Sequence, residues 1–81
     1  MYISQIIRKL TETGLCEIEE DVYLFTREQI IEDQQGWDDK DPCKNMDFTN
    51  SPLWLTTGSQ TPIPYSSFSE YITENYERLN K

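Results

Sequence analysis

The chain has 81 residues, of which 36% are hydrophobic and 12% aromatic, and it carries a formal net charge of −8 without a single histidine. This aromatic content is too high for a disordered acidic tail, and the negative charge disfavours direct binding to nucleic acids or anionic membranes. The lack of histidine excludes Ser-His and Cys-His catalysis and histidine-ligated metals. We expect one folded domain, residues 1–81, that is not an enzyme, needs no cofactor and binds a protein with a basic surface. A homodimer or a bound partner would stabilise so short a chain.

The N-terminal stretch has the periodicity of a helix. Ile3, Ile6, Ile7 and Leu10 fall at i, i+3, i+4 and i+7, which places four aliphatic side chains on one stripe. Gly14 is placed to end this helix as a left-handed residue.

Cys16 and Ile18 alternate with Glu17 and Glu19, as apolar and polar side chains do along a strand. The run Val22–Phe25 is rich in β-prone residues, which favours a hairpin. Tight hairpins prefer Asn-Gly or Asp-Gly, and neither pair is present between the two arms. We therefore expect a loop over Glu19–Asp21 rather than a two-residue turn.

A second helix is expected after this hairpin. Thr26 and Gln29 have the spacing of a capping box, and Gly36 is placed to end the helix. The stretch from Asp38 to Pro52 is rich in Asp, Lys, Asn and Pro, which predicts a loop.

The following residues predict a strand pair. Residues 53–57 have the composition of a strand, and 61–65 that of an extended partner. Pro62 and Pro64 lack the amide donors that a central strand needs, so the second arm belongs at a sheet edge.

Ser67 begins a second capping box, which predicts a C-terminal helix over residues 68–80. The expected order is α-β-β-α-loop-β-β-α. This order predicts a small α+β domain in which the helices pack on a short antiparallel sheet.

Acidic residues are concentrated in the segment 12–47, which contains twelve of the fifteen acids and only three cations. A cluster of one sign attracts a surface of the opposite sign. The residues that we expect at the partner interface are ten of these acids and one tryptophan: Glu17, Glu19, Glu20, Asp21, Glu28, Glu32, Asp33, Asp38, Asp39, Asp41 and Trp37.

Two pairs of these acids have spacings similar to those of phosphates. On one face of a strand, Glu17 and Glu19 would lie about 6.7 Å apart, close to two axial steps of ~3.4 Å in a DNA strand. On a helix, Glu28 and Glu32 would come within ~6 Å of each other. Such a surface can imitate a phosphate row and occupy a basic groove. The alternative explanation for the acids is solubility.

The segment 48–69 contains no charged residue and offers the rival interface. Trp54 and Ile63 are residue types that are common where proteins meet, although Trp54 can equally belong to the core. In this alternative the chain is a structural or adaptor subunit that docks through the uncharged segment.

The N-terminal stretch has neither a basic region nor an apolar run, and no stretch approaches the ~20 apolar residues of a membrane span. We therefore expect a cytoplasmic protein. In a reducing compartment, Cys16 and Cys43 are expected as thiols rather than as a disulfide.

In size, acidity and lack of histidine, the chain is similar to the small phage-encoded inhibitors of host defence, the anti-restriction and anti-CRISPR proteins, some of which mimic DNA. This resemblance in composition implies a non-catalytic inhibitor of a nucleic-acid-binding protein. It assigns a role to no particular residue.

Overall fold

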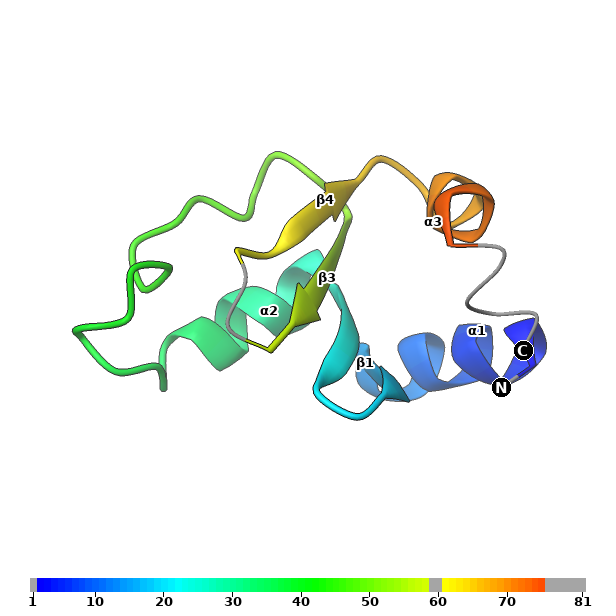
Figure 1. Cartoon of the computed structure of the whole chain (residues 1–81), viewed down its shortest axis with the longest axis horizontal. Helices are drawn as coiled ribbons and strands as arrows, with labels where there is room; N and C mark the ends of the chain where they lie inside the picture. The colour runs from blue at the N-terminus through cyan, green and yellow to red at the C-terminus, as the bar shows by residue number, and fades with distance from the viewer. Residues whose placement is uncertain (1, 59–60, 76–81) are drawn as a thin grey trace.

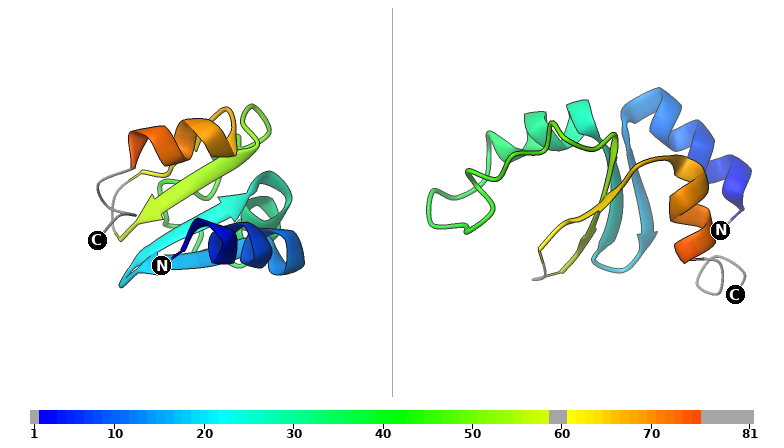
Figure 2. Two further views of the ribbon diagram at one scale, coloured as in Figure 1. Left: turned by 90° about the vertical axis from the view of Figure 1, so that its right-hand side faces the viewer. Right: turned by 90° about the horizontal axis from the view of Figure 1, so that it is seen from above.

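The computed structural model describes residues 2–58 and 61–75, which form a four-stranded sheet with helices on both of its faces (Figure 1, Figure 2). The strands lie in the order β1-β2-β3-β4, and each neighbouring pair is antiparallel. The elements are α1 (Ile3–Thr13), β1 (Leu15–Glu19), β2 (Val22–Thr26), α2 (Arg27–Gln34), β3 (Leu53–Thr57), β4 (Ile63–Tyr65) and α3 (Phe68–Glu74). The predicted α+β class and element order are confirmed.

The alternation of side chains along the central strands produces two hydrophobic cores, one on each face of the sheet. Leu24 and Leu55 point to the face that α1 and α3 cover, whereas Phe25 and Trp54 point to the face that α2 covers. The first core consists of Ile6, Cys16, Leu24, Leu53, Leu55, Tyr65 and Tyr71. The second core consists of Phe25, Ile30, Phe48 and Trp54.

The chain leaves the sheet after β2 and returns to it at the same place. Thr26 at the end of β2 lies directly opposite Leu53 at the start of β3. The Arg27 amide donates to the Pro52 carbonyl at 3.0 Å, and the Arg27 Nε donates to the Ser51 carbonyl at 3.2 Å. Residues 27–52, which comprise α2 and the predicted loop, therefore form an excursion that is closed at its base and covers the second core.

The hairpin turn is shorter than expected. Glu19 pairs with Val22, so only Glu20 and Asp21 connect β1 to β2, and the predicted longer loop is wrong. Asp21 takes the left-handed conformation, with φ at 62°, because its short side chain tolerates a region that glycine usually fills. Its carbonyl also accepts the Gly58 amide at 2.8 Å.

The predicted helix starts are confirmed, but the predicted end of α2 is wrong. The hydroxyls of Thr26 and Ser67 accept the amides of Gln29 and Glu70, as in a capping box. The helix α2 ends at Gln34, before Gly36, which does not adopt the left-handed conformation.

A lysine takes the place of the expected glycine cap. The Lys44 ammonium donates to the carbonyls of Gln34, Gln35 and Trp37, at 3.2, 2.9 and 2.9 Å. The Gln34 and Gln35 carbonyls end α2 and carry the negative end of its dipole, so a cation satisfies them without a left-handed residue.

The outer helices contribute less to the core than their periodicity suggests. In α1, which ends at the left-handed Gly14 as predicted, Ile6 is fully buried, whereas Ile3 and Ile7 remain 39% and 47% exposed. The predicted C-terminal helix over 68–80 ends at Glu74 in the structure, and residues 76–80 of that prediction lie outside the described residues. Within the described part of the chain, the helices are too short and too polar to cross a bilayer.

Candidate partner-binding site

The ten acids that we predicted at the interface all lie on the surface, and Trp37 is half-buried. They extend from β1 and the hairpin turn along α2 into the loop after it. Glu28 and Glu32 both belong to α2 and are four residues apart, as the predicted helical pair requires.

The predicted strand pair of acids does not share a face. A β-bulge lies between Glu17 and Glu19, so that Glu17 is opposite Tyr23 and Glu19 is opposite Val22. Residues that lie opposite each other share a face, and Tyr23 packs on the second core while Val22 packs on the first. The spacing of about 6.7 Å, which assumed a regular strand, is therefore wrong for these two glutamates.

Several acids of the loop shape its backbone. Asp38 and Asp41 accept the amides of Lys40 and Cys43 through Oδ1, each at 2.8 Å, and Asp47 makes the equivalent bond at 2.9 Å. Short side-chain to backbone bonds of this kind fix a turn. The loop is also attached to α2, because Gln34 Nε2 donates to the carbonyls of Cys43 and Met46 at 2.9 Å.

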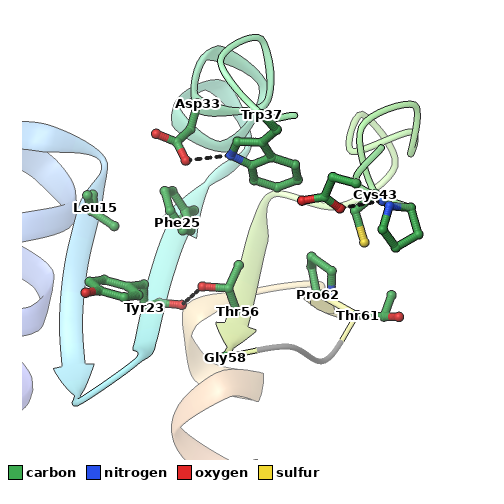
Figure 3. Close-up of a pocket in the computed structure, with 12 residues that line it drawn as sticks. Leu15, Tyr23, Phe25, Asp33, Trp37, Cys43, Thr56, Gly58, Thr61 and Pro62 are labelled. Carbon is green, nitrogen blue, oxygen red and sulfur yellow. Dashed lines mark hydrogen bonds between the residues drawn. The ribbon is translucent and has the colours of Figure 1, made fainter. Parts of the chain in front are cut away.

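The loop and the sheet border an open pocket of about 680 Å³ on the α2 face (Figure 3). Its floor comes from β1, β2 and β3, one wall comes from the end of α2 and the loop, and the connection to β4 provides the other wall. The lining residues are Leu15, Tyr23, Phe25, Asp33, Trp37, Asp41, Pro42, Cys43, Thr56, Gly58, Thr61 and Pro62.

The aromatic side chains of the pocket are held in place from behind. The Trp37 indole N–H donates to Asp33 Oδ2 at 2.9 Å, and the Trp37 ring meets the buried Phe48 ring edge-on at 5.9 Å. Phe25 belongs to the second core and is 6% exposed. Because a hydrogen bond and a ring contact both hold the Trp37 indole, this wall of the pocket is ordered before any ligand arrives.

The pocket is acidic as well as aromatic. Asp33 and Asp41 line it, and no lysine or arginine stands among its described lining residues. Tyr23 on the floor lies opposite Glu17, and the hydrogen bond to the Glu17 carboxylate, together with its negative charge, raises the pKa of the Tyr23 hydroxyl. The site therefore combines apolar surface with negative charge, which suits a cation that has an apolar or π-bonded body.

Of the predicted interface residues, the pocket brings together Asp33, Trp37 and Asp41. Glu17 is not in the lining, but it lies on the same face of the sheet, opposite the lining residue Tyr23. The other predicted acids also lie outside the lining. Sequence reasoning missed Tyr23 and most of the remaining lining. The alternation in Val22–Phe25 does place two aromatic rings on one face, but it contains no information about the opposite wall.

The two cysteines are thiols, as predicted. Cys16 is buried in the first core, and this burial raises the pKa of its thiol. Cys43 is half-buried and lines the pocket on the other side of the sheet.

Across residues 2–58 and 61–75, no three Cys, Asp or Glu side chains gather as a metal-ligand group. Comparisons with protein-family models, with curated proteins and with solved structures gave no match to this chain.

Proposed function

We propose that this protein is a non-catalytic inhibitor or regulator that binds the basic surface of a nucleic-acid-binding protein. The observation that carries the proposal is the aromatic pocket with Asp33 and Asp41 in its lining, on a molecule whose predicted interface acids are all exposed. In this proposal the partner is met in the cytoplasm, and the complex blocks its access to nucleic acid.

The charge and the pocket supply different parts of the binding. A net charge of −8 on so small a surface attracts a basic partner over a distance and accelerates the encounter. This contribution decreases as salt rises, because screening shortens its range. The pocket supplies the short-range fit that selects one partner among many basic proteins.

The experiment is affinity capture from a host lysate at low salt with the immobilised protein. Bound proteins are released in parallel with high salt and with a short DNA duplex at low salt. Release of the same nucleic-acid-binding protein by both treatments supports the proposal, because the duplex competes for the same basic surface. A captured protein that neither treatment releases contradicts it.

A pair of charge reversals identifies the surface. The variant Glu28→Lys with Glu32→Lys changes α2, and the matched control Glu12→Lys with Glu74→Lys makes the same change in net charge on α1 and α3. We expect the α2 variant to associate with the captured protein at least ~10-fold more slowly than the parent protein does. The control should slow association by a smaller factor. If the two variants slow association equally, net charge alone explains the effect, and a defined interface is refuted.

The alternative adaptor function has less surface at its disposal. Leu53, Trp54 and Leu55 are 7%, 2% and 2% exposed and belong to the two cores, so they are not available to a partner. Ile63, at 38% exposure on the edge strand β4, is an apolar side chain of this segment that a partner could reach. In the adaptor case, Ile63→Ala weakens capture while salt and the α2 variant have little effect.

A further inference from the structure

We infer that the pocket receives one arginine side chain from the basic partner. The inference rests on the proposed function, since it identifies the group that the site recognises on that partner. It is carried by three features of the pocket: a fixed indole, an aromatic floor and two carboxylates in the lining.

The pocket offers partners for both the flat face and the N–H groups of a guanidinium. Trp37 and Tyr23 line the pocket with electron-rich rings, and a planar cation can stack on rings of this kind. Asp33 and Asp41 offer acceptor oxygens for its N–H groups. Each carboxylate already accepts one bond, from the Trp37 indole and the Cys43 amide respectively, and an ionised carboxylate has about four lone-pair sites.

The chemistry of the lining favours arginine over the other candidates. An anion would meet two carboxylates and no described basic residue. A neutral apolar group would desolvate those carboxylates without pairing them. A lysine ammonium is more strongly hydrated and lacks the flat fork that stacks and pairs at the same time, so it loses more on leaving water. Arginine is also the residue that nucleic-acid-binding surfaces use most for paired contacts.

The test is a titration of the ¹⁵N-labelled protein with a capped Gly-Arg-Gly peptide, observed by NMR. The two indole N–H signals give a probe and an internal reference: Trp37 lines the pocket, whereas the Trp54 indole is buried and bonded to the carbonyls of Phe48 and Ser51. We expect the Trp37 signal to shift with saturation in the millimolar range and the Trp54 signal to stay in place.

Two further peptides make the result specific. The citrulline peptide keeps the shape of arginine without its charge, and the lysine peptide keeps the charge without the planar group. We expect both to bind at least ~5-fold more weakly than the arginine peptide. If the citrulline peptide binds equally well, the site is merely apolar, and if lysine binds equally well, it is merely acidic. Either result, or a Trp37 signal that does not move, overturns the inference.

Matched variants link the shift to the two carboxylates. Asp33→Asn and Asp41→Asn remove one charge each but keep an oxygen that can accept the existing bond, and we expect each to weaken the arginine peptide by roughly 10-fold. The controls Glu12→Gln and Asp47→Asn change exposed acids that lie outside both the lining and the predicted interface, and we expect less than ~2-fold from them. Controls that weaken binding as much as the pocket variants overturn the inference.

The fate of this inference is separable from that of the proposed function. Loss of capture in the α2 charge-reversal variant, with displacement by duplex DNA, supports the acidic interface whatever the peptides do. If capture behaves in that way and the arginine peptide does not bind, the inference fails and the proposed function stands.

Discussion

Lys44 joins the loop to the end of α2, and its removal gives a quantitative test of how the excursion 27–52 is held. Its ammonium donates to the carbonyls of Gln34, Gln35 and Trp37. The substitution Lys44→Met keeps most of the length and apolar stem of the side chain but removes the charge and all three donors.

The expected loss follows from these contacts. A hydrogen bond from a charged donor contributes about 1.5–3 kcal/mol when its partners are buried, and a cation at a helix C-terminus adds about 0.3–1 kcal/mol. Lys44 is only half-buried, so water replaces part of what is lost, and we expect the free energy of unfolding to fall by about 2 kcal/mol. The total free energy of unfolding of an 81-residue domain is roughly 4–12 kcal/mol. For a domain of this size, a loss of about 2 kcal/mol lowers the melting temperature by about 8–16 °C.

Urea and thermal unfolding, followed by circular dichroism, measure this change. The matched control is Lys40→Met, which makes the same change in charge on an exposed lysine of the same loop. We expect the control to stay within about 0.5 kcal/mol of the parent protein. If the two variants lose equal stability, net charge rather than the three carbonyl contacts explains the effect, and our account of the α2 terminus is refuted.

Two further predictions concern a glycine and a tyrosine. Gly14→Ala should destabilise the protein by roughly 1–3 kcal/mol more than Gly58→Ala in urea unfolding, because both residues have positive φ but only at Gly14 would a new Cβ meet another side chain, 2.9 Å from the Gln29 Cβ. The pKa of Tyr23, followed by ¹³C NMR, should lie above its usual value and fall in Glu17→Gln. Because the folded-state pKa of Tyr23 is raised, this pair stabilises the protein below the unfolded-state pKa, and its contribution is lost as the pH rises through the folded-state pKa.

Local patterns in the sequence predicted most of the fold because each depends on neighbours along the chain. The capping boxes at Thr26 and Ser67 identify the starts of α2 and α3, since the cap bonds join residues three apart. Pro62 and Pro64 place their arm at an edge because proline cannot donate to a neighbouring strand, and β4 does lie at the edge of the sheet.

The errors arose where contacts far along the chain replace local signals. The end of α2 was misplaced because Lys44, ten residues beyond Gln34, satisfies carbonyls that a glycine cap would otherwise satisfy. The two glutamates of β1 were placed on one face because a bulge cannot be recognised from alternation alone. Ile3 and Ile7 share the stripe of the buried Ile6 but remain partly exposed, because periodicity describes a stripe but not the width of the surface that covers it.

The pocket changes how the two proposed modes of binding can be separated. Its lining combines Asp33, Trp37 and Asp41 from the acidic segment with Thr61 and Pro62 from the uncharged one, so a ligand in the pocket contacts both segments. Salt dependence alone then shows only that charge contributes, because a partner in this pocket would be screened even while it packs on uncharged walls. The neutralised carboxylates, compared with matched acids outside the interface, separate the contribution of the pocket from that of net charge, and Ile63→Ala separates both from an interface on the edge strand.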